Sequence, residues 1–495
     1  MLFHSPEFIF LFLPLTLIIY YLLINRFSRL IGLSWLCVAS LFFYGYWNWR
    51  YLPLMIGSIL FNYLISKFMF LAKNNNDQLT KKITLIIGIT GDLLLLCYYK
   101  YVDFFISLSN QVMHTQYALM GVILPLGISF FTFTQIAYLI DCYRDKVDEY
   151  NFIKYALFVT YFPHLIAGPI LHHKEMISQF NNKNVLHAQE NFLAGVTMFT
   201  LGLCKKLFFA DSLAGTADAM FNAAIAGNLN TINAWIGTLA YTLQIYFDFS
   251  GYSDMAIGLS ILFGVRLPIN FYSPYKAASI IEFWRRWHIT LSRFLRDYLY
   301  IPLGGNRNGF FRRYLNLILT MLLGGFWHGA GWTFLIWGML HGGFLVVNHG
   351  WRHFHSIIDF KLPTYLSHPV SVLLTFFCVM IAWVFFRSPD VKTALTILHC
   401  MAGSHIGAAS EENLILSNRL LLALPLMVAL LLPNSLQIIS RYNIALANPV
   451  QIIANRWYQW RISPFSALMS GLLFAVALLG VFAISDSAQF LYFEF

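Results

Sequence analysis

Long apolar segments, separated by short polar turns, follow one another along the whole chain. A helix needs about 20 apolar residues to cross the hydrocarbon core of a bilayer, so runs of this kind predict transmembrane helices. With weaker segments included, the pattern predicts roughly 11 to 13 transmembrane or partial helices. Because the apolar residues do not alternate as they would in a β-barrel, the predicted fold is an all-α polytopic membrane protein. The clearest runs are 8–23, 30–46, 52–69, 83–96, 119–140, 236–263, 370–386, 420–432 and 465–484.

Composition supports this assignment. Of the 495 residues, 58% are hydrophobic and 11% are charged, whereas about 25% of the residues in an average soluble chain are charged. The formal net charge of +10 raises the question of a nucleic-acid partner, but basic residues gathered at membrane edges are the ordinary result of topology. We therefore expect the chain to lie in a lipid bilayer and to bind no nucleic acid.

The charges that flank the first apolar segments predict their orientation. No Lys or Arg precedes the first segment, while Arg26 and Arg29 follow it, and Lys73, Lys81 and Lys82 follow the third. Under the positive-inside rule these turns are cytosolic. The first segment is therefore a retained helix with its N-terminus outside, and not a cleaved signal peptide.

Nothing in the sequence divides the chain. It has no internal repeat, low-complexity tract or long linker, which predicts a single domain over residues 1–495 with a catalytic core at 240–350. The six cysteines are scattered through apolar runs and have no metal-ligand spacing, so we expect no metal site. Gly-rich nucleotide loops, HExxH pairs and GxSxG elbows are absent from the sequence, which leaves histidine as the candidate for chemistry.

The most basic part of the chain is 266–313, with nine basic residues against two acidic ones, Glu282 and Asp297. This imbalance places it on the cytosolic side. Aromatic and apolar residues recur at near-helical spacing within 282–300, which predicts interfacial helices ahead of a loop at 302–309. Arginine donors suit the diphosphate of a coenzyme A thioester and the headgroups of anionic lipids equally well. The candidate donor-binding residues are Arg285, Arg286, Arg293 and Arg296.

A second candidate region is the apolar run 315–347, which is too long for one upright crossing and predicts a tilt or a break at one of its glycine clusters. A helix through this run places His328 near the middle of the membrane, where an ionisable group is a functional hypothesis by default. Neighbouring glycines would let a backbone or a substrate approach, with Trp327 and Trp332 as walls. The alternative is that small residues pack helices together and that the histidine forms an interhelical hydrogen bond.

Two further histidines, His341 and His288, differ in the roles that their positions predict. His341 follows His328 by thirteen residues, which rotates it by about 220° on a continuous helix, onto another face unless the helix breaks. It is therefore a candidate for an interhelical hydrogen bond. His288 lies among arginines and tryptophans, where a histidine can act in catalysis, cap a helix or meet lipid headgroups.

Two carboxylates, Asp248 and Asp254, lie six residues apart within an apolar run. Six residues correspond to about 240° around a regular helix, so the pair does not share a face, which disfavours a paired-carboxylate mechanism. We expect them to line a polar cavity, neutralise nearby arginines or hold a broken helix together.

Together these segments resemble the membrane-bound O-acyltransferase family, and within it the bacterial alginate O-acetyltransferase branch. The resemblance runs nearly from end to end of the chain, and its last two segments are long and specific. The segments that carry it are 1–8, 124–133, 138–144, 162–170, 248–254, 283–307 and 324–332.

This resemblance implies a ring of helices around a central tunnel in a bacterial cytoplasmic membrane. It maps the family's catalytic histidine onto His328 and a second motif residue, Asn or His among members, onto His288. It also implies transfer of an acetyl group from a cytosolic thioester, acetyl-CoA, to an extracytoplasmic polysaccharide or wall polymer through a periplasmic acetyltransferase, without a permanently bound cofactor. The alternatives are transfer of D-alanine or another acyl group to a wall polymer and, in a different class, a transporter or exporter subunit.

Overall fold

A computed structural model describes residues 1–147, 151–181, 188–307, 309–357, 363–404, 415–442, 444–446, 458–483 and 490–491. These residues are helical apart from turns, extended connections and isolated bridges such as the parallel one between Pro268 and Leu446, which confirms the predicted all-α class. The α-helices of the first half are α1 (Leu13–Arg26), α2 (Arg29–Trp47), α3 (Leu52–Asn74), α4 (Gln78–Leu96), α5 (Val102–Met113), α6 (Ile128–Tyr143), α7 (Phe152–Thr160), α8 (Phe162–Leu165), α9 (His173–Asn181), α10 (Ala188–Cys204) and α11 (Ser212–Ile225). Those of the second half are α12 (Thr231–Leu262), α13 (Ile280–Trp284), α14 (Ile289–Leu295), α15 (Gly309–His328), α16 (Trp332–Ile357), α17 (Thr364–Arg387), α18 (Val391–Met401), α19 (Ile415–Leu430), α20 (Ser435–Ile438) and α21 (Pro464–Ala483). Short 3-10 or π-helical segments are η1 (Glu7–Phe12), η2 (Trp49–Tyr51), η3 (Cys97–Tyr101), η4 (Lys205–Asp211), η5 (Pro274–Lys276), η6 (Arg296–Tyr300) and η7 (Ser440–Tyr442).

Length and composition identify seven helices able to cross a membrane within the described ranges. This makes the chain a multi-pass membrane protein. The predicted 11 to 13 crossings also counted the runs 119–140, 236–263 and 420–432, which correspond to α6, α12 and α19 and are not among the seven. The seven spans are Glu7–Arg26, Arg29–Trp47, Trp49–Asn74, Gln78–Met113, Gln189–Ile225, Ser367–Arg387 and Pro464–Phe482.

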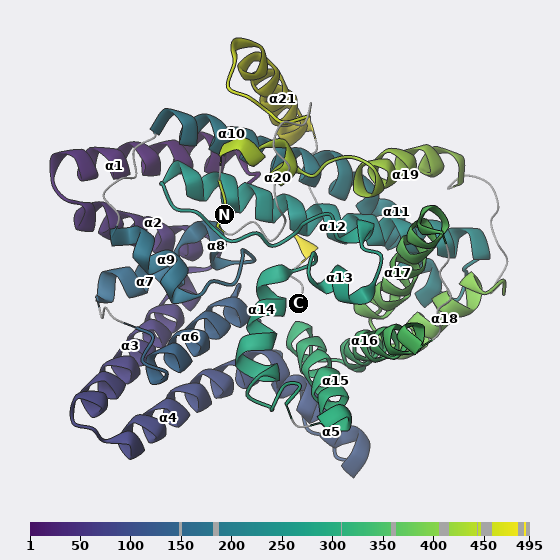
Figure 1. The fold of residues 1–495 in the computed structure, drawn as a ribbon, viewed down its shortest axis with the longest axis horizontal. Coiled ribbons are helices and arrows are strands. Elements are labelled where there is room, and N and C mark those ends of the chain that lie inside the picture. Colours follow the sequence, from purple (N-terminus) through teal and green to yellow (C-terminus); the bar gives the residue numbers. More distant parts are fainter. Residues whose placement is uncertain are drawn as a thin grey trace.

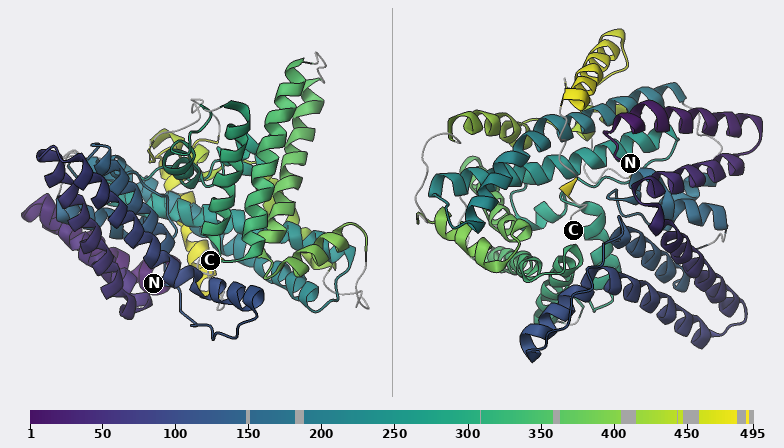
Figure 2. Two further views of the ribbon diagram at one scale, coloured as in Figure 1. Left: turned by 90° about the horizontal axis from the view of Figure 1, so that it is seen from below. Right: turned by 180° about the vertical axis from the view of Figure 1, so that it is seen from behind.

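Helix α12 lies at the middle of the molecule, with α1–α4 to one side and α16–α18 to the other (Figure 1). Every residue from 240 to 262 is buried. Two glycine pairs bring α12 against α10: a Cβ on Gly251 would lie 2.8 Å from the carbonyl oxygen of Gly202, and one on Gly258 would lie 2.6 Å from that of Gly195. Small residues of this kind let membrane helices touch backbone to backbone. Helix α21 projects from this assembly in Figure 1 and in the right view of Figure 2.

The basic candidate region, 266–313, forms short helices in the centre of the molecule. The predicted helical spacing over 282–300 corresponds to α13, α14 and η6, with a break between α13 and α14. The long run 315–347 breaks at residues 329–331, so that α15 ends at His328 and α16 begins at Trp332. The other predicted break, at Gly324 and Gly325, is not seen, because both residues lie within α15.

Candidate functional site

His328 is the last residue of α15 and is 4% exposed. Its imidazole lies among aromatic side chains, with ring centroids 4.8 Å from Trp327, 5.2 Å from Trp337 and 5.2 Å from Phe386. All three meet it edge to face. A packed aromatic wall of this kind fixes the ring plane and excludes water from it.

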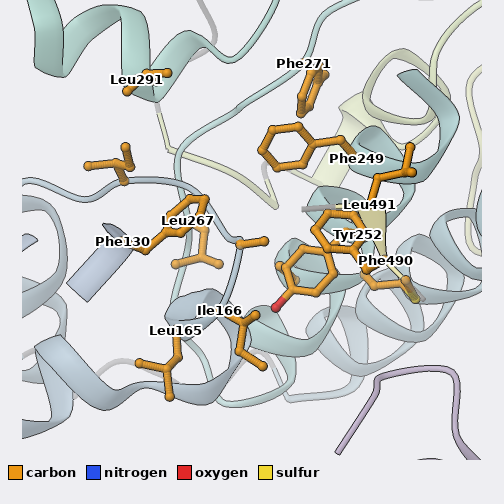
Figure 3. Packing of buried hydrophobic residues seen from close by; sticks show 14 of the residues in the cluster. Phe130, Leu165, Ile166, Phe249, Tyr252, Leu267, Phe271, Leu291, Phe490 and Leu491 are labelled. Atoms are coloured by element: carbon orange, nitrogen blue, oxygen red, sulfur yellow. The ribbon is translucent and has the colours of Figure 1, made fainter. Parts of the chain in front are cut away.

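His288 precedes α14 and is fully buried. Its backbone is left-handed, with φ 42° and ψ 53°, which is uncommon for a residue with a side chain and turns the chain sharply between α13 and α14. Phe249 meets its ring edge to face at 4.8 Å, and Phe271 stacks at 6.4 Å. Figure 3 shows these two phenylalanines side by side in the buried core.

The fold brings the two histidines together although forty residues separate them in sequence. The ring centroids of His288 and His328 lie 6.4 Å apart, with a 55° angle between the ring planes. Two buried imidazoles at this separation can address one small group placed between or beside them. Neutral imidazole can accept a proton at physiological pH and the imidazolium that forms can donate it again, so the pair suits proton transfer from a reacting hydroxyl to a leaving group.

Asn270 is a site residue that the sequence analysis missed. Its Oδ1 atom lies 3.1 Å from Nδ1 of His288, and its side chain is fully buried. The residue lies in an extended connection after α12, where no hydrophobic period marks it. Only its tertiary contact with His288 shows its importance.

Lys100 is a second missed residue, and it contacts the end of the helix that carries His328. Its Nζ atom donates to the carbonyl oxygen of Trp327 at 2.6 Å and to the hydroxyl of Ser129 at 3.2 Å. Tyr101 donates in the same way to the carbonyl oxygen of Phe326 at 2.9 Å. These donors satisfy carbonyls that the last turn of α15 leaves without partners in the helix. The signal was present in the sequence as a lysine that follows an apolar run without a break, since Lys100 lies within the span Gln78–Met113 and an ionisable group inside a span is itself a functional hypothesis.

The glycines around His328 pack protein against protein. A Cβ on Gly325 would lie 2.3 Å from the carbonyl oxygen of Phe334, and one on Gly329 would lie 2.1 Å from the Phe334 ring. Of the interpretations weighed from the sequence, close approach of a neighbouring chain segment therefore describes these positions, and space for a substrate does not. The expected second wall is also different, because Trp332 is 52% exposed and Trp337 takes that place.

His341 is fully buried on α16, behind the site. Its ring centroid lies 4.7 Å from Trp337, which also contacts His328, and 5.1 Å from Trp284. The break between α15 and α16 thus brings His341 near His328, with Trp337 between them. Neither ring nitrogen has a hydrogen-bond partner among the described residues, so the expected interhelical hydrogen bond is not seen there.

The carboxylates of α12 pair with the two lysines of η4, and not with arginines as one of the expectations had it. Asp248 accepts from Lys206 at 2.8 Å, and Asp254 accepts from Lys205 at 2.6 Å. Asp254 also accepts from the hydroxyl of Ser435 at 2.6 Å. Both aspartates are buried, so these pairs form a polar network that joins α12 to η4 within the apolar core.

Three of the four arginines considered for donor binding engage carboxylates of the chain itself. Arg286 pairs with Glu282 at 2.5 Å, Arg296 with Asp297 at 2.7 Å, and Arg293 holds both oxygens of Glu175 at 2.5 and 2.7 Å. Hydrogen bonds to Asp297 raise the pKa of Arg296 above its ordinary value. Arg285 is exposed.

Comparison with known proteins identifies the family of this chain. Residues 17–387, which include both histidines, match the membrane-bound O-acyltransferase family. The chain belongs to this family. A peptidoglycan O-acetyltransferase of Helicobacter pylori is 42% identical over 100% of this chain and 98% of its own length. A probable alginate O-acetylase of Pseudomonas aeruginosa is 43% identical over 83% of this chain and 77% of its own. A teichoic acid D-alanyltransferase of Streptococcus thermophilus is 30% identical over 46% of this chain and 57% of its own.

Membership in the membrane-bound O-acyltransferase family makes the chain an enzyme, an O-acyltransferase, and confirms the resemblance found from the sequence. It also decides against the transporter alternative. The acetyltransferase relatives are more similar to this chain, and over a longer stretch, than the D-alanyltransferase relative.

Proposed function

We propose that the chain transfers an acetyl group from acetyl-CoA on the cytosolic side to a hydroxyl group on the far side of a bacterial cytoplasmic membrane. The observation that carries this proposal is the buried pair His288 and His328, whose ring centroids are 6.4 Å apart at the centre of the molecule. Membership in the O-acyltransferase family supplies the reaction class. The names of the most similar relatives support acetyl as the acyl group.

In the proposed reaction, His328 removes the proton from the attacking hydroxyl, and the oxygen forms a bond to the thioester carbonyl carbon. The carbon–sulfur bond then breaks, and the coenzyme A thiolate takes up the proton from the imidazolium. His288 holds the thioester or shares the proton transfer. General acid–base catalysis by such a group contributes roughly 100- to 10,000-fold in rate.

For the final acceptor we propose peptidoglycan, with another extracytoplasmic polysaccharide as the second candidate. The end-to-end match to a peptidoglycan O-acetyltransferase supports this order, because the probable alginate O-acetylase matches over a shorter share of both chains. A periplasmic acetyltransferase is proposed to receive the acetyl group first. The N-terminus lies outside in this arrangement, as the positive-inside rule predicts for Arg26 and Arg29.

The test uses membranes from cells that express the full chain, supplied with radiolabelled acetyl-CoA. Ester-linked acetate is released by mild base and counted separately from purified peptidoglycan and from exopolysaccharide. We expect label in peptidoglycan and its loss in His328→Gln. The matched control is His349→Gln, a histidine on α16 that contacts Arg313 at 3.1 Å, outside the site. Normal transfer by a folded His328→Gln variant contradicts the proposal, and label in exopolysaccharide alone selects the second acceptor.

The second candidate reaction is D-alanyl transfer, which the teichoic acid D-alanyltransferase relative favours. The same membranes supplied with radiolabelled D-alanine, a carrier protein and its ligase test it. Label in wall polymer under these conditions, with none from acetyl-CoA, would replace acetyl by D-alanyl in the proposal.

A further inference from the structure

The side chain of Asn270 is the centre of a hydrogen-bond cluster beside His288. Its Oδ1 atom lies 2.9 Å from the hydroxyl of Thr290, 3.3 Å from the backbone nitrogen of Thr290 and 3.1 Å from Nδ1 of His288. Its backbone carbonyl accepts from the backbone nitrogen of Ile289 at 2.9 Å. Asn270 and His288 are fully buried, and Thr290 is 2% exposed, so these contacts decide the hydrogen-bonding state of the cluster.

The donors and acceptors of this cluster can be assigned. The backbone N–H of Thr290 only donates, which requires the oxygen and not the NH₂ group of the Asn270 amide at that position. The backbone N–H of Ile170 donates to the Thr290 hydroxyl at 3.0 Å, so that hydroxyl has its hydrogen available for Asn270. An amide oxygen only accepts, so the contact with His288 requires a hydrogen on Nδ1.

We infer that Asn270 is a positioning residue that holds His288 as the Nδ1–H tautomer, with Nε2 as the proton-accepting nitrogen. The inference rests on the proposed acyl transfer and chooses between the two roles given there to His288. The proton that His328 removes from the attacking hydroxyl can then be relayed to Nε2 of His288 and passed to the coenzyme A thiolate when the carbon–sulfur bond breaks.

The experiment compares purified, reconstituted full-length variants in acetyl transfer from acetyl-CoA. Asn270→Leu keeps the branched shape of the side chain and removes the acceptor oxygen, while Asn270→Asp keeps an oxygen toward Nδ1. We expect Asn270→Leu to lower kcat by about 100-fold or more, the lower range for loss of a general acid–base group, with the KM for acetyl-CoA within about twofold. We expect Asn270→Asp to stay within about tenfold of the wild type, since it still accepts the Nδ1 hydrogen.

The control is Ser253→Ala, which removes a 3.5 Å contact to the NH₂ group of the same amide and leaves Oδ1 untouched. Each variant must retain its elution profile and unfolding temperature in detergent, and Asn270→Ala replaces Asn270→Leu if the latter does not assemble. Near-normal kcat without the oxygen overturns the inference, as does an Asp variant as inactive as His288→Ala. If His288→Ala keeps its activity, the proposed role of His288 fails instead, so the two failures are distinguishable.

Discussion

Replacement of Gly325 by alanine tests whether the site depends on the contact between α15 and α16. A Cβ at this position would lie 2.3 Å from the carbonyl oxygen of Phe334 and 3.1 Å from the Cα atom of Gly338, whereas ordinary contacts begin at 3.4 Å. The obstructing atoms belong to the backbone of α16, and no rotamer change can remove them. The two helices must therefore separate by about 1 Å, an overpacking that typically costs about 1–3 kcal/mol.

The displacement reaches the chemistry because His328 is only three residues further along α15. A shift of about 1 Å in a reacting group is enough to lower a rate by about 100-fold. We therefore expect Gly325→Ala to lower acetyl transfer by about that factor, even where the variant still assembles. Activity per folded molecule is measured in reconstituted membranes, and the unfolding temperature is measured in detergent.

The matched control is Gly343→Ala on α16, where a Cβ would meet nothing within 4 Å. Alanine is about 1 kcal/mol better than glycine inside a helix, so this variant should be as stable as the wild type or more so. Gly338→Ala should resemble Gly325→Ala, because its Cβ would lie 2.5 Å from the carbonyl oxygen of Met321. Equal activity of Gly325→Ala and Gly343→Ala would refute the reasoning.

Three further perturbations follow from other contacts. Lys100→Met removes the donor to the carbonyl of Trp327, next to His328, and we expect it to reduce acetyl transfer more than Tyr101→Phe. The latter removes the donor to the carbonyl of Phe326, one residue further from His328, so equal effects would contradict this explanation. Asp248→Asn weakens the buried ion pair between α12 and Lys206 of η4 and should destabilise the protein by about 3 kcal/mol. The measurement is the unfolding temperature, and an unchanged temperature would contradict this prediction. Hydrogen bonds from Lys81 hold the pKa of Asp145 below its ordinary value, so the stabilising contribution of Asp145 is complete at neutral pH and is lost as the pH falls below about 4. Asp145→Asn should abolish this part of the pH dependence of the unfolding temperature, and an unchanged pH profile would contradict the prediction.

The membrane fold could be predicted from the sequence because its cause is local. Apolar runs such as 52–69 exceed the thickness of the bilayer core, and a backbone in lipid must satisfy its own hydrogen bonds as a helix. Interruptions were harder to place. The glycine clusters at 324–325 and 329–331 are equivalent in sequence, and both pack against Phe334. Gly325 remains helical, whereas the second cluster forms the break between α15 and α16.

Candidate chemistry was predictable only where a residue is anomalous in its own segment. His328 is anomalous, because an ionisable group within a long apolar run has few structural uses. His288 lies among arginines at a predicted interface, and only the family resemblance indicates a catalytic role for it. Asn270 gave no signal, since a polar residue in a connection between helices is ordinary until its Oδ1 atom is seen 3.1 Å from His288.

The site residues share one structural property that explains why they are hard to find: they lie at interruptions of helices. His328 ends α15, His288 precedes α14, Asn270 lies in the connection between α12 and η5, and Lys100 belongs to η3. Interrupted helices free backbone carbonyls and N–H groups, which membranes tolerate only where protein or a cavity surrounds them. The freed carbonyls of α15 accept from Lys100 and Tyr101, and the carbonyl of Asn270 accepts from the N–H of Ile289. The same contacts that make the breaks tolerable also hold the two imidazoles in place, so substitutions at these donors are expected to act on turnover as well as on stability.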